Sequence, residues 1–213
     1  MKPKLKICGI TTLEDARFCA AAGVDFLGFV MYEESPRCVD PNLARDIREW
    51  VVGPLSVGVF VDEDPATVNA LAQQIGFDLV QLHGTETPDD CRLIDRPVIK
   101  AIGVPPDGTA DELSAEVDRF SSVADYLMFD TRLNGRSGGT GMTFDWTLLA
   151  DAARRHRVFL AGGIHAGNAL QAVEAVHPFA LDVSSGVEER PGVKDFDRIS
   201  QLVETLGRSR RQA

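Results

Sequence analysis

The first strand-like segment of the chain ends on a thiol. Apolar and polar residues alternate over residues 4–8, which predicts a short strand with Cys8 at its carboxyl end. Gly9 then allows the backbone to turn, and Thr11 or Thr12 can cap the helix that follows. A strand end before a glycine turn is where an α/β protein displays a reactive side chain. Cysteine is also a common small core residue, so the other strand ends must decide between a reactive and a packing role.

Polar and glycine-rich sequence follows several other apolar segments in the same way. These strand ends read Gln81-Leu82-His83-Gly84, Phe129-Asp130-Thr131, Ala161-Gly162-Gly163-Ile164 and Asp182-Val183-Ser184-Ser185-Gly186. Glycines after the last two segments indicate a phosphate site, because a bare backbone turn brings several N–H groups to one point. The alternative is that Gly162 and Gly163 only make a tight turn.

A second glycine-rich stretch, Gly138-Gly139-Thr140-Gly141, matches neither a Walker loop nor a dinucleotide-binding fingerprint. We interpret it as a flap that closes over a ligand, which gives Gly139 and Gly141 a substrate-binding role.

Eight β-rich segments alternate with amphipathic segments along the chain. The predicted strands are 4–8, 26–31, 56–61, 79–82, 98–102, 126–130, 158–161 and 179–183. The predicted helices are 13–22, 41–50, 65–75, 88–94, 110–120, 146–156, 166–176 and 197–206. Such alternation predicts a parallel sheet, and eight units in about 200 residues fit an α/β single-domain (βα)₈ TIM barrel. A doubly wound open sheet is the alternative. The barrel is expected over residues 1–207, followed by a frayed basic tail at 208–213.

Composition narrows the classes of partner. The chain has 213 residues and a formal net charge of −10, which disfavours binding to nucleic acid or to an anionic membrane. Its apolar runs are too short to span a bilayer, and its start has no signal-peptide pattern, so we expect a cytoplasmic protein. The four cysteines are scattered without metal-ligand spacing and are expected to be free thiols.

The motifs, in order and over nearly the whole chain, resemble phosphoribosylanthranilate isomerase of tryptophan biosynthesis. The resemblance lies in Lys6-Ile7-Cys8-Gly9-Ile10-Thr11, Gln81-Leu82-His83-Gly84, Asp130-Thr131, Gly138-Gly139-Thr140-Gly141, Thr143-Phe144-Asp145-Trp146, Ala161-Gly162-Gly163-Ile164 and Asp182-Val183-Ser184-Ser185-Gly186-Val187-Glu188. It implies an Amadori rearrangement of an aminoaldose to an aminoketose without metal or cofactor. It also implies a small phosphorylated substrate and either a monomer or a homodimer.

By this resemblance Asp130 is the general acid and Cys8 the general base. Arg37 is the best candidate to bind the anthranilate carboxylate, because a guanidinium matches a carboxylate in a bidentate manner. The alternative is that Arg37 is a solvated arginine in a loop and has no role in binding. His83 either contacts the substrate or forms hydrogen bonds with other groups at the rim of the barrel. Gly162, Gly163 and the Ser184-Ser185-Gly186 turn are expected to bind phosphate.

A thiol needs a nearby cation or helix dipole to become a thiolate near neutral pH. Lys6 lies two residues before Cys8 and therefore on the same face of the strand. Our hypothesis is that Lys6 sits under Cys8 inside the barrel and pairs with Asp182, because a lone buried lysine is costly. Two residues depart from the family pattern: Met142 stands where a lysine is usual, and Cys38 where an aromatic residue is frequent.

Two other functions remain open at this point. One is a different phosphate-binding barrel enzyme, such as an indole-glycerol-phosphate synthase or a tryptophan synthase α-like lyase, for which Lys100 is the only candidate catalytic lysine. The other is a barrel that binds a phosphorylated ligand without turnover.

Overall fold

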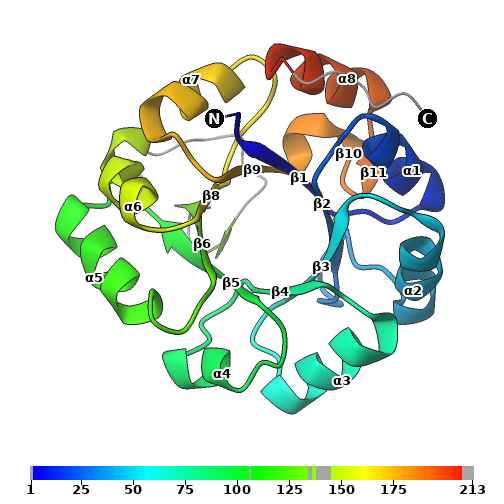
Figure 1. Cartoon of the computed structure of the whole chain (residues 1–213), viewed down its shortest axis with the longest axis horizontal. Coiled ribbons are helices and arrows are strands. Elements are labelled where there is room, and N and C mark those ends of the chain that lie inside the picture. The colour runs from blue at the N-terminus through cyan, green and yellow to red at the C-terminus, as the bar shows by residue number, and fades with distance from the viewer. Residues whose placement is uncertain (1, 106, 134–135, 138–144, 208–213) are drawn as a thin grey trace.

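Eight parallel strands close into a barrel with helices around it (Figure 1) in the computed structural model, which describes residues 2–105, 107–133, 136–137 and 145–207. The barrel strands are β1 (Lys4–Cys8), β2 (Phe26–Val30), β3 (Leu55–Phe60), β4 (Leu79–Leu82), β5 (Val98–Val104), β6 (Tyr126–Leu133), β8 (Val158–Leu160) and β9 (Ala180–Val183). Each pairs with the next, and β9 pairs back to β1. The TIM barrel prediction is confirmed, and the open doubly wound sheet is excluded.

The helices follow the strands in the predicted order. They are α1 (Leu13–Ala21), α2 (Pro41–Trp50), α3 (Pro65–Ile75), α4 (Pro88–Arg92), α5 (Ala110–Phe120), α6 (Ala150–Arg155), α7 (Ala169–Val176) and α8 (Phe196–Thr205). Local sequence explains where several begin: the Thr12 side chain caps α1, and an aspartate followed by proline starts both α2 and α3.

Two helices are shorter than predicted. The helix expected over 88–94 ends at Arg92, and the helix expected from residue 166 begins only at Ala169. In the second case Asn168 holds a turn instead: its Oδ1 accepts from the His165 amide and its Nδ2 donates to the Gly163 carbonyl oxygen. The segment expected over 146–156 divides into the 3₁₀ helix η1 (Trp146–Leu149) and α6.

Small elements at the carboxyl end of the barrel were not predicted. They are β7 (Arg136–Ser137), the 3₁₀ helix η2 (Ser185–Val187), and the antiparallel hairpin of β10 (Glu188–Arg190) and β11 (Val193–Lys194). The hairpin strands are too short for an alternation of apolar residues to reveal them. Gly192 adopts φ +81° in the hairpin turn, so the pair Pro191-Gly192 was the available signal.

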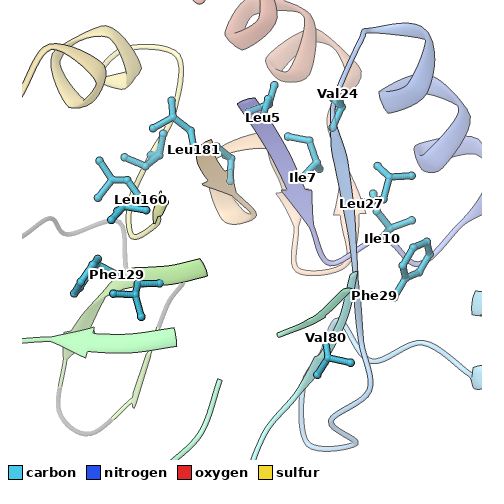
Figure 2. Close-up of a cluster of buried hydrophobic side chains, with 14 of the residues drawn as sticks. Leu5, Ile7, Ile10, Val24, Leu27, Phe29, Val80, Phe129, Leu160 and Leu181 are labelled. Carbon is cyan, nitrogen blue, oxygen red and sulfur yellow. The ribbon is translucent and has the colours of Figure 1, made fainter. Parts of the chain in front are cut away.

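The apolar core forms two layers, one on each face of the barrel strands. Figure 2 shows part of the outer layer, where Ile7, Leu27 and Leu160 pack between strands and helices. The inner layer consists of strand residues such as Phe26, Met128 and Phe159. Because Lys6 pairs in register with Phe26, and Cys8 with Gly28, both side chains share the inner face. Among the described residues, no helix is long and apolar enough to cross a membrane.

Candidate active site

A buried ion pair lies directly under the thiol of Cys8. Lys6 stands opposite Asp182 in the β1–β9 register, and its Nζ donates to Asp182 Oδ1 at 2.7 Å. The Lys6 side chain is fully buried and also forms a hydrogen bond with the Cys8 side chain. The missing side chain of Gly28 makes room here, because a Cβ at that position would lie 2.8 Å from Cys8 Sγ and 3.1 Å from Lys6 Nζ. The hypothesis that Lys6 points into the barrel and pairs with Asp182 is confirmed.

Burial and charge act in opposite directions on these two groups. Burial would lower the pKa of Lys6, but Asp182 and Cys8 outweigh it and raise that pKa, so Lys6 remains an ammonium group. Burial raises the pKa of the Cys8 thiol, against the opposing influence of Lys6 and Lys194. The free protein therefore holds Cys8 as a neutral thiol at pH 7.

Asp130 lies in the carboxyl-terminal half of β6, which extends to Leu133 rather than ending at residue 130 as predicted, and it contacts His83 after β4. Asp130 is buried, and its Oδ2 lies 3.4 Å from His83 Nε2. The other ring nitrogen, Nδ1, lies 2.6 Å from the amide nitrogen of buried Gln81. Asp130 Oδ1 has no hydrogen-bond partner within the described part of the chain. One edge of the carboxyl group therefore faces His83, and the other oxygen is unpaired within the described part of the chain.

Gly162 allows the backbone of the next strand end to approach Asp130. It adopts φ +87°, and a Cβ there would lie 2.4 Å from Thr131 Oγ1 and 2.9 Å from Asp130 Oδ1. Gly163 follows with φ +65°. Both conformations favour glycine, so this pair shapes the surroundings of Asp130 whether or not it also binds phosphate.

The second glycine-containing turn packs against the first. A Cβ at Gly186 would lie 2.0 Å from the carbonyl oxygen of Ile164. Ser184 uses its Oγ to donate to the Cys8 carbonyl oxygen at 3.1 Å, and Ser185 begins η2, half-buried. The hydroxyl hydrogen of Ser184 is thus already donated to the backbone of β1.

Arg37 is held in an ion pair that the sequence did not reveal. Its Nη2 lies 2.7 Å from Glu188 Oε2, and its Nε donates to Glu188 Oε1 at 2.9 Å. The stem of Arg37 packs on Gly9, where a Cβ would lie 2.7 Å from Arg37 Cδ. Lys194 completes the cluster with Nζ 2.8 Å from Glu188 Oε1, and it also donates to the Cys8 carbonyl oxygen. Lys194 was missed because the hairpin that carries it was missed.

Some predicted features fall outside the described residues. Gly139 and Gly141 of the predicted flap, the departure at Met142 and the basic tail at 208–213 are among them. Cys38, the other departure, lies half-buried beside Arg37.

Residues 5–205 match the family model described as N-(5'-phosphoribosyl)anthranilate (PRA) isomerase. The chain belongs to this family. It is an isomerase of tryptophan biosynthesis. It is 43% identical over 211 residues to N-(5'-phosphoribosyl)anthranilate isomerase of Pelobacter propionicus, covering 99% of this chain and 98% of the relative. For the relative from Citrifermentans bemidjiense the identity is 46% over 201 residues, covering 94% and 95%.

Solved structures of the family have the same fold. Phosphoribosyl anthranilate isomerase from Thermotoga maritima superposes with a TM-score of 0.87 at 39% identity, covering 96% of this chain and 98% of that chain. A further phosphoribosyl anthranilate isomerase was solved in complex with reduced 1-(o-carboxyphenylamino)-1-deoxyribulose 5-phosphate; its TM-score is 0.84 at 36% identity, with the same coverage.

Lys100, the lysine that an alternative barrel enzyme would use, faces away from the barrel interior of this isomerase. Its register neighbours Leu82 and Leu127 belong to the outer core layer. Its Nζ lies 2.7 Å from Glu86 Oε2 and 2.8 Å from the Gly84 carbonyl oxygen. This buried pair anchors the loop after β4. It lies on the outer face of the barrel strands, whereas Cys8 and Asp130 lie on the inner face.

Proposed function

We propose that this chain converts N-(5'-phosphoribosyl)anthranilate to 1-(2-carboxyphenylamino)-1-deoxyribulose 5-phosphate with Asp130 as general acid and Cys8 as general base. The reaction is an isomerisation, so every proton added to the sugar must be balanced by one removed. It needs an acid at the ring oxygen and a base at carbon 2. Cys8 ends β1 and Asp130 lies in the carboxyl-terminal half of β6, and these strands are three positions apart in one closed barrel.

Asp130 protonates the furanose ring oxygen, and the C1–O bond breaks to leave a Schiff base between C1 and the anthranilate nitrogen. The resulting carboxylate faces His83, whose Nε2 lies 3.4 Å from its Oδ2. Oδ1 has no partner among the described residues, and this is the oxygen from which we expect the proton to leave.

Cys8, as the thiolate formed when its thiol proton passes to solvent water, then removes the proton from carbon 2. The C–H electron pair forms the C1–C2 double bond of an enolamine, which tautomerises to the ketone by gaining a proton at C1 and losing one from the C2 hydroxyl. The thiol of Cys8 is neutral in the free protein because burial raises its pKa. Lys6 lies in hydrogen-bond contact, and the positive charge of the Schiff base next to C2 adds a second cation that favours the thiolate.

The remaining contacts orient the two ends of the substrate. Arg37 faces the anthranilate carboxylate, and the turns at Gly162-Gly163 and Ser184-Ser185-Gly186 receive the phosphate through backbone N–H groups. Gly139 and Gly141, which lie outside the described residues, are proposed to bind the substrate as well. We place the enzyme in the cytoplasm, as a monomer or a homodimer.

The observation that carries this proposal is the stack of Asp182, Lys6 and Cys8 inside the barrel, with the two charged groups buried. A binding module has no use for a lysine beneath a thiol. The test is the loss of fluorescence when the purified chain is mixed with freshly made phosphoribosylanthranilate. We expect turnover without added metal or cofactor. Binding without turnover would instead favour the non-catalytic barrel.

A further inference from the structure

Lys194 is a buried cation that transfers no proton in the proposed acid and base steps. Its side chain is fully buried, and its Nζ contacts Glu188 Oε1 at 2.8 Å and the carbonyl oxygen of Cys8. Burying an ammonium group is costly unless its donors are satisfied. Lys194 therefore joins two parts of the proposed site: the strand end that carries the base, and the carboxylate that holds Arg37.

Glu188 divides its negative charge between two cations. Its Oε1 accepts from Lys194 and from Arg37 Nε, with a longer contact of 3.3 Å from the Gly192 amide. Its Oε2 accepts from Arg37 Nη2 at 2.7 Å and Nε at 3.2 Å. Arg37 Nη1 forms no hydrogen bond to the described residues. This edge of the guanidinium is therefore open to a further acceptor.

Arg37 and Lys194 share the single negative charge of Glu188, so the three groups together carry a net charge of +1. An arginine paired alone with a buried carboxylate has its charge largely cancelled and attracts a second carboxylate only weakly. Other nearby charges are the same whether or not Lys194 is present. Arg198 donates to the Glu188 carbonyl oxygen and is itself paired with Asp195. Asp15 contributes the same charge in both cases. Removing Lys194 makes the site one unit more negative.

We propose that Lys194 is a positioning residue for recognition of the substrate carboxylate. It neutralises Glu188, so that Glu188 can hold Arg37 in place without cancelling the charge with which Arg37 attracts the carboxylate. This inference rests on the proposed role of Arg37. Its effect is confined to ligands that carry the carboxylate, whereas a purely structural role of Lys194 would affect all ligands alike.

The experiment compares two ligands that differ only in that group. One is reduced 1-(o-carboxyphenylamino)-1-deoxyribulose 5-phosphate, and the other is its phenylamino counterpart without the carboxylate. The ratio of their dissociation constants, measured by calorimetry, reports the affinity that the carboxylate adds. We expect Lys194→Met to reduce this ratio by roughly tenfold, while affinity for the counterpart changes little. Lys194→Arg, which keeps the charge, should restore part of the ratio.

Lys100→Met is the matched control. Lys100 is also a buried lysine in a short ion pair with a glutamate, but it lies on the outer face of the barrel. Its loss should lower stability and leave the ratio unchanged. An unchanged ratio in Lys194→Met, with a ratio that collapses in Arg37→Met, would overturn the role of Lys194 alone. A wild-type protein that binds both ligands equally would instead overturn the assignment of Arg37.

Discussion

Single residues near the thiol show how this site combines burial with charge. Cys8 has a cation within hydrogen-bond contact, yet burial still raises the pKa of its thiol. The ammonium group of Lys6 is held in place by Asp182, whose negative charge opposes the lowering of the Cys8 pKa by Lys6. In the proposed mechanism the thiolate is favoured when the reacting substrate adds the positive charge of its Schiff base. This limits oxidation or alkylation of Cys8 in the free enzyme, since both need the thiolate.

Thiolate absorbance in the ultraviolet tests this directly. The difference between wild type and Cys8→Ser should show no thiolate at pH 7, and the thiolate should appear only in the alkaline range, because the pKa of Cys8 is raised. Lys6→Met should move the transition further upward, since it removes the nearest cation and leaves Asp182 unpaired. A thiolate signal already present at neutral pH would contradict the account.

Strand register and the turns that follow the strands place Cys8 and Asp130, the proposed base and acid. The strand ends at Cys8, His83, Asp130 and Gly162 were predictable, because apolar runs of strand length end there in glycine or polar residues. The ion pair of Lys6 with Asp182 was also predictable, since a buried lysine inside a barrel needs a partner. The contact of Glu188 with Arg37 was not, because Arg37 follows β2 and Glu188 begins the hairpin after β9, outside the barrel strands whose register could have paired them. Lys194 was hidden by a hairpin with no recognisable periodicity.

Gly162→Ala tests how the turn after β8 supports Asp130. The new Cβ would meet Thr131 and Asp130 while the backbone stays at φ +87°, so we expect a loss of about 2 kcal/mol in the free energy of unfolding and a lower kcat. Gly76→Ala is the control: it has a similar φ of +82°, but its nearest contact is the flexible side chain of Arg48 at 3.4 Å. That variant should lose stability and keep kcat. Equal kcat in both variants would remove Gly162 from the support of Asp130.

At the scale of the whole molecule, an acidic protein binds an acidic substrate. The formal net charge is −10, whereas the substrate carries a phosphate and a carboxylate. We expect the attraction to come from local cations at the carboxyl rim, where Arg37 and Lys194 share one glutamate, and from backbone N–H groups of the turns. The barrel brings these groups together from distant parts of the chain.

The same ion cluster couples folding to pH. Burial would raise the pKa of Glu188, but hydrogen bonds from Arg37 and Lys194 outweigh it and lower that pKa below the ordinary 4.5. A carboxylate with a depressed pKa stabilises the fold above its unfolded value, and this contribution is lost as the pH falls through the folded value. Urea unfolding between about pH 3 and pH 7 should therefore show a steeper loss of stability in wild type than in Glu188→Gln. Parallel curves would contradict this role of Glu188.

The most direct test of the central claim measures kcat and KM for phosphoribosylanthranilate in Cys8→Ser and Asp130→Asn. Both substitutions nearly preserve side-chain volume, and each removes one proton-transfer group. The account predicts that kcat falls by a factor on the order of a thousand or more in each variant while KM stays close to that of wild type. Near-normal turnover in either variant would show that the acid or the base has been assigned to the wrong residue.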